Sequence, residues 1–202
     1  MKIILATRSK YKIKAMRKLG IKFVVKRSSV NESCVSREDP RLLVLKLAEL
    51  KAKDVSRKYK EGIIIGMDSV GFFNNRILEK PKSKKEAIGR LKRLSGRTHY
   101  AYTGIYIIYK KGDKLKSLSR VVKTKIIMRE LSNDEIEKYV KSDENILSYC
   151  LGYDPDSALS SSFIKEIEGS YNNILSGTPI EVITEMLNKV VPSNLKDNLG
   201  LA

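Results

Sequence analysis

The chain has 202 residues, with 40 Lys and Arg against 23 Asp and Glu, so its formal net charge is +17. This length allows one domain with its own apolar core, and the composition excludes a disordered, collagen-like or repeat protein. No stretch reaches the roughly 18 uninterrupted apolar residues that a membrane-spanning helix needs. The single His and the two Cys, Cys34 and Cys150, argue against a zinc site and against His-dependent nucleophilic catalysis. We expect reduced thiols in a cytoplasmic protein.

The excess of positive charge has two interpretations. It is typical of a protein with a polyanionic partner, such as nucleic acid, a nucleotide or a membrane surface. It is also typical of a surface rich in solvated Lys, and 28 of the 40 basic residues are Lys. Charge alone does not separate the two, so the second interpretation is preferred until a site favours the first.

Apolar runs predict strands, and apolar positions at helical spacing predict helices between them. In the first half of the chain, Ser9 is a good N-cap and Gly20 fits the position that ends a helix. The expected strands there are Ile3–Ala6, 21–26, 63–67, 70–73 and Arg76–Leu78, and the expected helices are 10–19 and 40–59.

The second half continues the alternation. Capping boxes begin at Ser83 and Ser132, and Pro179 is expected to start the last helix. The expected helices are Lys84–Leu94 and 133–140, the expected strands are 98–109, 115–128 and 163–167, and residues 143–162 have no clear pattern. This order predicts a mixed α/β fold with a few long strands. We expect one domain over residues 1–191, with two lobes around a cleft, and a loose tail over 192–202.

Three polar positions can carry chemistry. Thr7 and Ser9 lie where a strand ends and a helix begins, which suits phosphate binding, although a Ser at this position is also typical of a simple helix cap. Asp68 follows an apolar strand, where ligands of α/β sheets gather, although such an Asp can also cap a turn. Lys80 precedes a Pro, which restricts the backbone of Lys80 to an extended conformation. Its side chain can then bind a phosphate, or it can simply lie in solvent. The lone His99 is expected to be structural.

These positions resemble, in order, the motifs of the Maf family of nucleoside triphosphate pyrophosphatases. The family pattern has an S-x-S-x-R-R-like corner, an A-D-T after a strand, a K-P, an L-S-G-x-x-H-x-x-x-T-G and a late G-S-Y followed by G-x-P. The matches here are Thr7-Arg8-Ser9, Met67-Asp68-Ser69, Lys80-Pro81, residues 94–104, and Gly169-Ser170-Tyr171 with Gly177-Thr178-Pro179. They cover residues 3 to 187, which is nearly the whole chain.

The resemblance implies a fold, an activity and a set of site residues. The fold is an elongated, curved mixed sheet with flanking helices and a central cleft, as in the related inosine triphosphate pyrophosphatases. The activity is hydrolysis of a nucleoside triphosphate to the monophosphate and pyrophosphate, with Mg²⁺, Mn²⁺ or Co²⁺, by a cytoplasmic homodimer. Asp68 is implied as the general base, and Glu32 and Asp68 as metal ligands. The implied phosphate-binding residues are Thr7, Ser9, Lys12, Lys51 and Lys80.

Three positions depart from the family pattern. Tyr11 replaces the first of the paired arginines, Ser69 stands where many members have Thr or Gln, and Asp156 falls near the family's Gln. All three match family positions that influence which nucleotide base is preferred. The resemblance therefore supports the hydrolytic activity better than it supports a preference for a particular base.

Two other functions are compatible with the sequence. One is a house-cleaning pyrophosphatase for inosine or xanthosine triphosphate, and the other is a non-catalytic regulator that binds nucleotides or nucleic acid. Aromatic residues make up only 7% of the chain and Trp is absent, which argues against stable nucleic-acid binding by base stacking. We therefore expect a nucleoside triphosphate as the partner, and no membrane.

Overall fold

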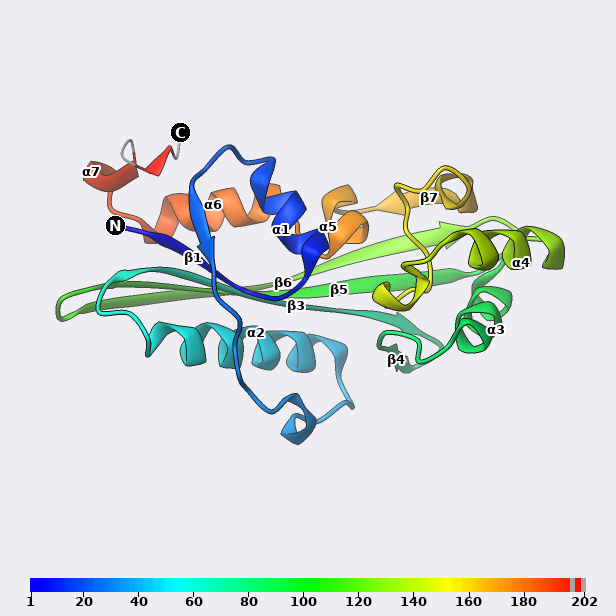
Figure 1. Cartoon of the computed structure of the whole chain (residues 1–202), viewed down its shortest axis with the longest axis horizontal. Helices are drawn as coiled ribbons and strands as arrows, with labels where there is room; N and C mark the ends of the chain where they lie inside the picture. The colour runs from blue at the N-terminus through cyan, green and yellow to red at the C-terminus, as the bar shows by residue number, and fades with distance from the viewer. Residues whose placement is uncertain (197–198, 201–202) are drawn as a thin grey trace.

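The computed structural model describes residues 1–196 and 199–200 (Figure 1). It is built on one mixed sheet in the order β2-β1-β3-β5-β6-β7, with β4 paired to β3, and this confirms the predicted mixed α/β fold. The long strand β5 runs antiparallel to both of its long neighbours, β3 and β6, whereas β1 is parallel to both β2 and β3. The strands are β1 (Ile3–Ala6), β2 (Phe23–Val25), β3 (Gly62–Phe73), β4 (Arg76–Leu78), β5 (Thr98–Lys111), β6 (Lys114–Met128) and β7 (Ile164–Glu168).

Helices cover both faces of this elongated sheet. Figure 1 shows α2 along one face, α1, α5 and α6 over the other, and α3 and α4 at the end opposite the β5–β6 turn. The helices are α1 (Lys10–Arg17), α2 (Pro40–Ser56), α3 (Lys84–Leu94), α4 (Asn133–Ser142), α5 (Tyr171–Ser176), α6 (Ile180–Val190) and α7 (Ser193–Lys196), with short 3₁₀ turns η1 (Glu32–Cys34), η2 (Ile146–Ser148) and η3 (Ser160–Phe163). In the described part of the chain, no helix is both long enough and apolar enough to cross a membrane.

The contact between α2 and the sheet is unusually close because it is made at two glycines. A Cβ on Gly66 would lie 2.1 Å from the carbonyl oxygen of Ala48, and one on Gly104 would lie 2.2 Å from that of Val44. Real Cβ atoms do not approach carbonyl oxygens so closely, so both positions need glycine. The close packing fixes the height of α2 above β3 and β5.

The apolar core is divided along the length of the sheet. One large cluster joins α1 and α6 to β1, β3 and β5, with Met16, Ile65 and Leu187 among its fully buried members. A second large cluster lies at the end where α3 and α4 pack, around Tyr139 and Phe163. Smaller clusters fill the space beneath α2. The middle of the molecule, between the two large clusters, is where polar side chains gather.

The structure differs from the predicted elements in three places. Residues 63–67 and 70–73 are not separate strands, because Asp68 and Ser69 stay paired with Gly104 and Thr103 of β5. The segment after Gly169, to which no element was assigned, contains the short helix α5 capped by Ser170. The expected loose tail includes α7, and Leu195 and Leu199 pack against the first cluster. Residues 197–198 and 201–202 of that tail lie outside the described residues.

One edge of β3 is only partly covered. β1 pairs with residues 63–66 and β4 pairs with residues 71–73. Within the described chain, residues 67–70 therefore have a strand partner on the β5 side only. The strand order leaves a gap at this edge, between the end of β1 and the end of β4, and polar residues of β3 reach the surface there.

Candidate active site

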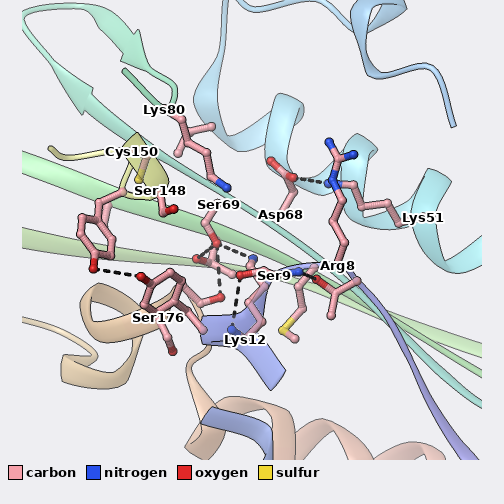
Figure 2. A pocket seen from close by; sticks show the side chains of 18 of the residues that line it. Arg8, Ser9, Lys12, Lys51, Asp68, Ser69, Lys80, Ser148, Cys150 and Ser176 are labelled. Carbon is pink, nitrogen blue, oxygen red and sulfur yellow. Dashed lines mark hydrogen bonds and ion pairs between the residues drawn. The ribbon is translucent and has the colours of Figure 1, made fainter. Parts of the chain in front are cut away.

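A pocket of about 860 Å³ opens at this gap (Figure 2). Its walls come from the β1–α1 corner, the loop after β2, α2, the middle of β3, the segment around Tyr149, and α5. Nine of the ten predicted site residues line it, namely Thr7, Ser9, Tyr11, Lys12, Glu32, Lys51, Asp68, Ser69 and Lys80. Segments far apart in the chain thus meet at one pocket.

Asp68 and Lys51 form the closest charged contact in the pocket. Lys51 Nζ lies 2.5 Å from Asp68 Oδ1 and 3.1 Å from Glu32 Oε1, so one ammonium joins two carboxylates. Burial opposes protonation of Lys51, but the attraction of Asp68 and Glu32 outweighs it and raises the pKa of the ammonium above its ordinary value. Lys51 therefore stays charged and has its charge balanced within the site.

Lys12 has a different environment on the opposite face of β3. Its Nζ donates to Ser69 Oγ over 2.8 Å, and that hydroxyl also lies 2.8 Å from Thr103 Oγ1. The side chain is almost fully buried, and Lys12 contacts hydroxyls rather than a carboxylate. Burial lowers the pKa of Lys12 to about 8, a shift that the charge of Asp68 limits and that of Lys51 increases.

Ser69 links β3 to the late motif of the chain. Its hydroxyl lies 3.2 Å from the carbonyl oxygen of Gly177, to which it can donate. Gly177 has φ of 58° as the C-cap of α5, and a Cβ there would lie 2.2 Å from Ser69 Oγ. Both the backbone conformation and the close approach therefore require glycine at this position. The late motif is a wall of the pocket, not an isolated turn.

The β1–α1 corner has its own hydrogen bonds. Thr7 Oγ1 accepts from the backbone N–H of Ser9 over 3.1 Å, and Ser9 Oγ accepts from the N–H of Lys12 as the N-cap of α1. The capping role of Ser9 is therefore real. It coexists with a position in the pocket wall, where the first turn of α1 presents N–H groups and the positive end of its dipole.

Two tyrosines meet across the pocket. The hydroxyls of Tyr11 and Tyr149 lie 3.0 Å apart, and their rings contact edge to face at a centroid distance of 5.2 Å. Burial and the hydrogen bond with Tyr11 raise the pKa of Tyr149 well above its ordinary value, so Tyr149 stays neutral. This pair places aromatic surface where the family pattern has a cation.

Asp156 differs in position from the other nine predicted site residues. Asp156 is exposed and is not among the described residues that line the pocket, while its neighbour Pro155 is. Its backbone N–H donates to the side chain of Asp154, which turns the chain at that point. The segment around residues 148–155 reaches the pocket without a regular strand or α-helix, so position along the chain was a poor guide to where Asp156 lies.

His99 lies away from the reacting groups. It is fully buried, and its Nε2 is 2.9 Å from the hydroxyl of Tyr153. Burial lowers its pKa to about 4, so the ring is neutral at physiological pH. This environment agrees with the structural role expected from the sequence.

The carboxylates of the pocket can be compared with what a metal ion needs. The described residues contain no group of three or more His, Cys, Asp and Glu side chains able to hold an ion. Glu32 and Asp68, however, converge on the same ammonium of Lys51. Mg²⁺ is commonly held by one or two carboxylates together with substrate phosphates and water. The pair therefore fits a divalent ion that is bound jointly by the protein and a phosphate-bearing ligand.

Sequence reasoning did not assign two residues that the structure brings into the pocket. Thr103 is fully buried in β5, and its hydroxyl lies 2.8 Å from that of Ser69. Its signal was a hydroxyl residue in the middle of a long predicted strand. Tyr149 closes the aromatic end, but it lies in a segment with no periodicity, so no sequence signal marked it.

The family model and the curated relatives confirm the resemblance to the Maf family. The dTTP/UTP pyrophosphatase of Syntrophus aciditrophicus is 35% identical over 92% of this chain and 88% of that protein. The 7-methyl-GTP pyrophosphatase of Nitrosococcus oceani is 29% identical over 93% of this chain and 92% of that protein. Among solved structures, the Staphylococcus aureus Ham1 protein has a TM-score of 0.44 at 15% identity, covering 64% of this chain and 73% of that one. The family model for Maf-like protein matches residues 2–190, and the chain therefore belongs to the Maf family.

Proposed function

We propose that this protein is a nucleoside triphosphate pyrophosphatase, which cleaves the bond between the α- and β-phosphates to give the monophosphate and pyrophosphate. The observation that carries the proposal is the pocket at the open edge of β3, where two carboxylates and three ammonium groups converge. A triphosphate matches this combination because it carries several negative charges and needs a proton acceptor for the attacking water. The names of the curated relatives support the same reaction class.

Asp68 is the proposed general base. Its Oδ1 accepts from Lys51, and its carboxylate lies at the centre of the pocket wall (Figure 2). The ammonium fixes the orientation of the carboxylate, so that it can take a proton from a water molecule next to the α-phosphorus. Because His99 is remote and neutral, Asp68 is the group in the pocket best suited to this step.

The ammonium groups of Lys12, Lys51 and Lys80 are proposed to offset the charge of the phosphates. Glu32 and Asp68 would hold a divalent ion, Mg²⁺ or alternatively Mn²⁺ or Co²⁺, jointly with the substrate. Such an ion would polarise a phosphate oxygen and neutralise charge on the phosphate chain. From the family resemblance we also propose that the protein works as a homodimer in the cytoplasm.

Base choice is proposed to depend on Tyr11, Ser69 and Tyr149. The tyrosine pair offers neutral aromatic surface, which suits stacking or edge contacts with a base more than charge pairing. The dTTP/UTP and 7-methyl-GTP activities of the relatives differ in base, so neither is assigned to this chain.

The test is a panel of purified nucleoside and deoxynucleoside triphosphates with Mg²⁺ or Mn²⁺, in which pyrophosphate and monophosphate are measured together. We expect equimolar release of the two products from at least one triphosphate. Release from inosine or xanthosine triphosphate alone would favour the purine house-cleaning alternative. No release from any nucleotide, together with tight salt-sensitive binding of RNA or DNA, would favour the regulator.

Lys80→Ala should lower turnover much more than Lys114→Ala. Lys80 lines the pocket, whereas Lys114 is exposed at the β5–β6 turn, and both changes remove one positive charge. We expect kcat/KM to fall by about tenfold or more for Lys80→Ala, since a charge-assisted contact is lost. Lys114→Ala should stay within about twofold of the wild type, because an exposed charge contributes little. Equal losses in the two variants would show that Lys80 acts only through the overall charge.

The activity should also depend on the protonation of Lys12. Its pKa of about 8 means that the ammonium is charged below pH 8 and loses its proton above it. Because the charged form attracts an anion, kcat/KM should decline as the pH rises through about 8. Lys12→Arg keeps its charge throughout this range and should flatten the decline. A decline of the same size in the arginine variant would assign the titration to another group.

A further inference from the structure

Two arginines at the mouth of the pocket have no assigned role. Arg8 lies in the β1–α1 corner and Arg27 in the loop after β2, and both are exposed and line the pocket. Among the described residues, neither guanidinium makes a hydrogen bond or an ion pair. In Figure 2 the side chain of Arg8 extends from the corner toward the pair formed by Lys51 and Asp68. Both guanidiniums are therefore free to bind an anion at that end.

The pocket has two chemically different ends. Figure 2 shows Lys51 and Arg8 on one side of Asp68 and Ser69, and Cys150 and Ser176 on the other. Tyr11 and Tyr149 line the pocket together with Cys150, the residue that follows Tyr149 in the chain, which makes this second end the aromatic one.

The loop that carries Arg27 is attached at the charged end. The backbone N–H of Ser29 donates to Asp54 Oδ2 over 2.9 Å, and Asp54 lies one turn beyond Lys51 on α2. Arg27 is thus tied to the same part of the pocket as Lys51. The loop after β2 and the β1–α1 corner bring their two guanidiniums to the end that is remote from the aromatic pair.

These two ends orient a triphosphate. If the proposed function holds, the α-phosphorus lies beside Asp68, between the two ends. A base then has aromatic contacts at the Tyr11–Tyr149 end, and the β- and γ-phosphates extend toward Arg8 and Arg27. Lys51 cannot by itself balance the charge of the leaving pyrophosphate, because its own charge is already offset by Glu32 and Asp68.

We propose that Arg8 binds the β- and γ-phosphates of the substrate and the pyrophosphate that leaves, and that Arg27 supplies a second guanidinium contact to the same phosphates. A guanidinium matches two phosphate oxygens through a planar pair of N–H donors, which an ammonium does not do. This assignment rests on the proposed function and adds the direction in which the substrate lies. It also concerns a position that the family pattern leaves open, since Arg8 stands at the x of S-x-S.

The test compares Arg8→Ala with Lys10→Ala. Lys10 is exposed, lies two residues from Arg8, and is not among the described residues of the pocket wall, so the two variants lose the same charge. Isothermal titration calorimetry with inorganic pyrophosphate should give a Kd raised about tenfold or more by Arg8→Ala and by less than about twofold by Lys10→Ala. Arg8→Lys should give an intermediate value, and Arg27→Ala should weaken pyrophosphate binding in the same direction as Arg8→Ala.

Product inhibition supplies a second readout that a structural role would not produce. Arg8→Ala should raise the inhibition constant of pyrophosphate and leave that of the monophosphate product within about twofold. Equal changes for both products, or an equal effect of Lys10→Ala on pyrophosphate, would overturn the assignment. A wild type that binds pyrophosphate but turns over no triphosphate would refute the proposed function instead, while the calorimetry would still decide the role of Arg8.

Discussion

Asp68→Asn is expected to lower kcat for the best triphosphate by about 10³-fold, within the range that general base catalysis contributes. The amide has the shape of the carboxylate and can still accept a hydrogen bond from Lys51, which also keeps Glu32 as an ion partner. It cannot take a proton from water, so the loss should appear in kcat at saturating substrate. Pyrophosphate release over a range of substrate concentrations measures this.

Asp113→Asn is the matched control. Asp113 is exposed in the turn between β5 and β6, and its change removes the same charge without touching the pocket. We expect an unchanged kcat in this variant and an unchanged far-ultraviolet circular dichroism spectrum in both. If Asp68→Asn keeps more than a tenth of the wild-type kcat, another group in the pocket accepts the proton.

Gly104→Ala is expected to destabilise the fold by about 3 kcal/mol or more, at the upper end of what overpacking costs. The new Cβ would lie 2.2 Å from the carbonyl oxygen of Val44, which is backbone of α2 and cannot rotate away. The helix has to move off the sheet, and Lys51 moves with it. Urea unfolding should therefore show a lower midpoint, and turnover should fall as well.

Gly89→Ala is the control for Gly104→Ala, because it adds the same methyl group at a position with open space. Gly89 lies inside α3, and a Cβ there meets no atom within 4 Å. Alanine is favoured over glycine in a helix interior by about 1 kcal/mol, so this variant should be more stable than the wild type. If Gly104→Ala unfolds at the wild-type urea concentration, the close contact between α2 and β5 is not part of the fold in solution.

The sequence predicted the pocket well where its signals were local. Ser9 caps α1 and Lys80 follows β4 next to Pro81, and both boundaries follow from signals close in the chain. Asp68 was marked by the apolar run before it, although β3 continues past it. Because the fold brings the end of β1, the middle of β3 and the end of β4 together, residues assigned separately line one pocket. Their order along the chain, matched to the family, predicted which boundaries belong to the same site.

The sequence-based predictions failed for segments whose structure depends on contacts with residues far away in the chain. The polar pair Asp68 and Ser69 predicted a break in a strand, but fourteen-residue β5 provides pairing along the whole of β3. Helix α5 has six residues, which is too few for helical periodicity to show. The path of residues 143–162 is determined by contacts such as the hydroxyl of Tyr139 accepting from the N–H of Asp154, and no local pattern predicts such a contact.

The alternation of side chains along β3 has a consequence for how the site can vary. Asp68 points toward α2 and contacts Lys51, whereas Ser69 points toward α1 and contacts Lys12. Adjacent residues therefore belong to two groups of contacts, and among the described residues no side-chain hydrogen bond joins Asp68 to Ser69 or to Lys12. A substitution at Ser69 can reshape the side of the pocket next to α1 and α5 while the carboxylate keeps its place. The two groups still act on each other through charge, because Asp68 and Lys51 both influence the pKa of Lys12.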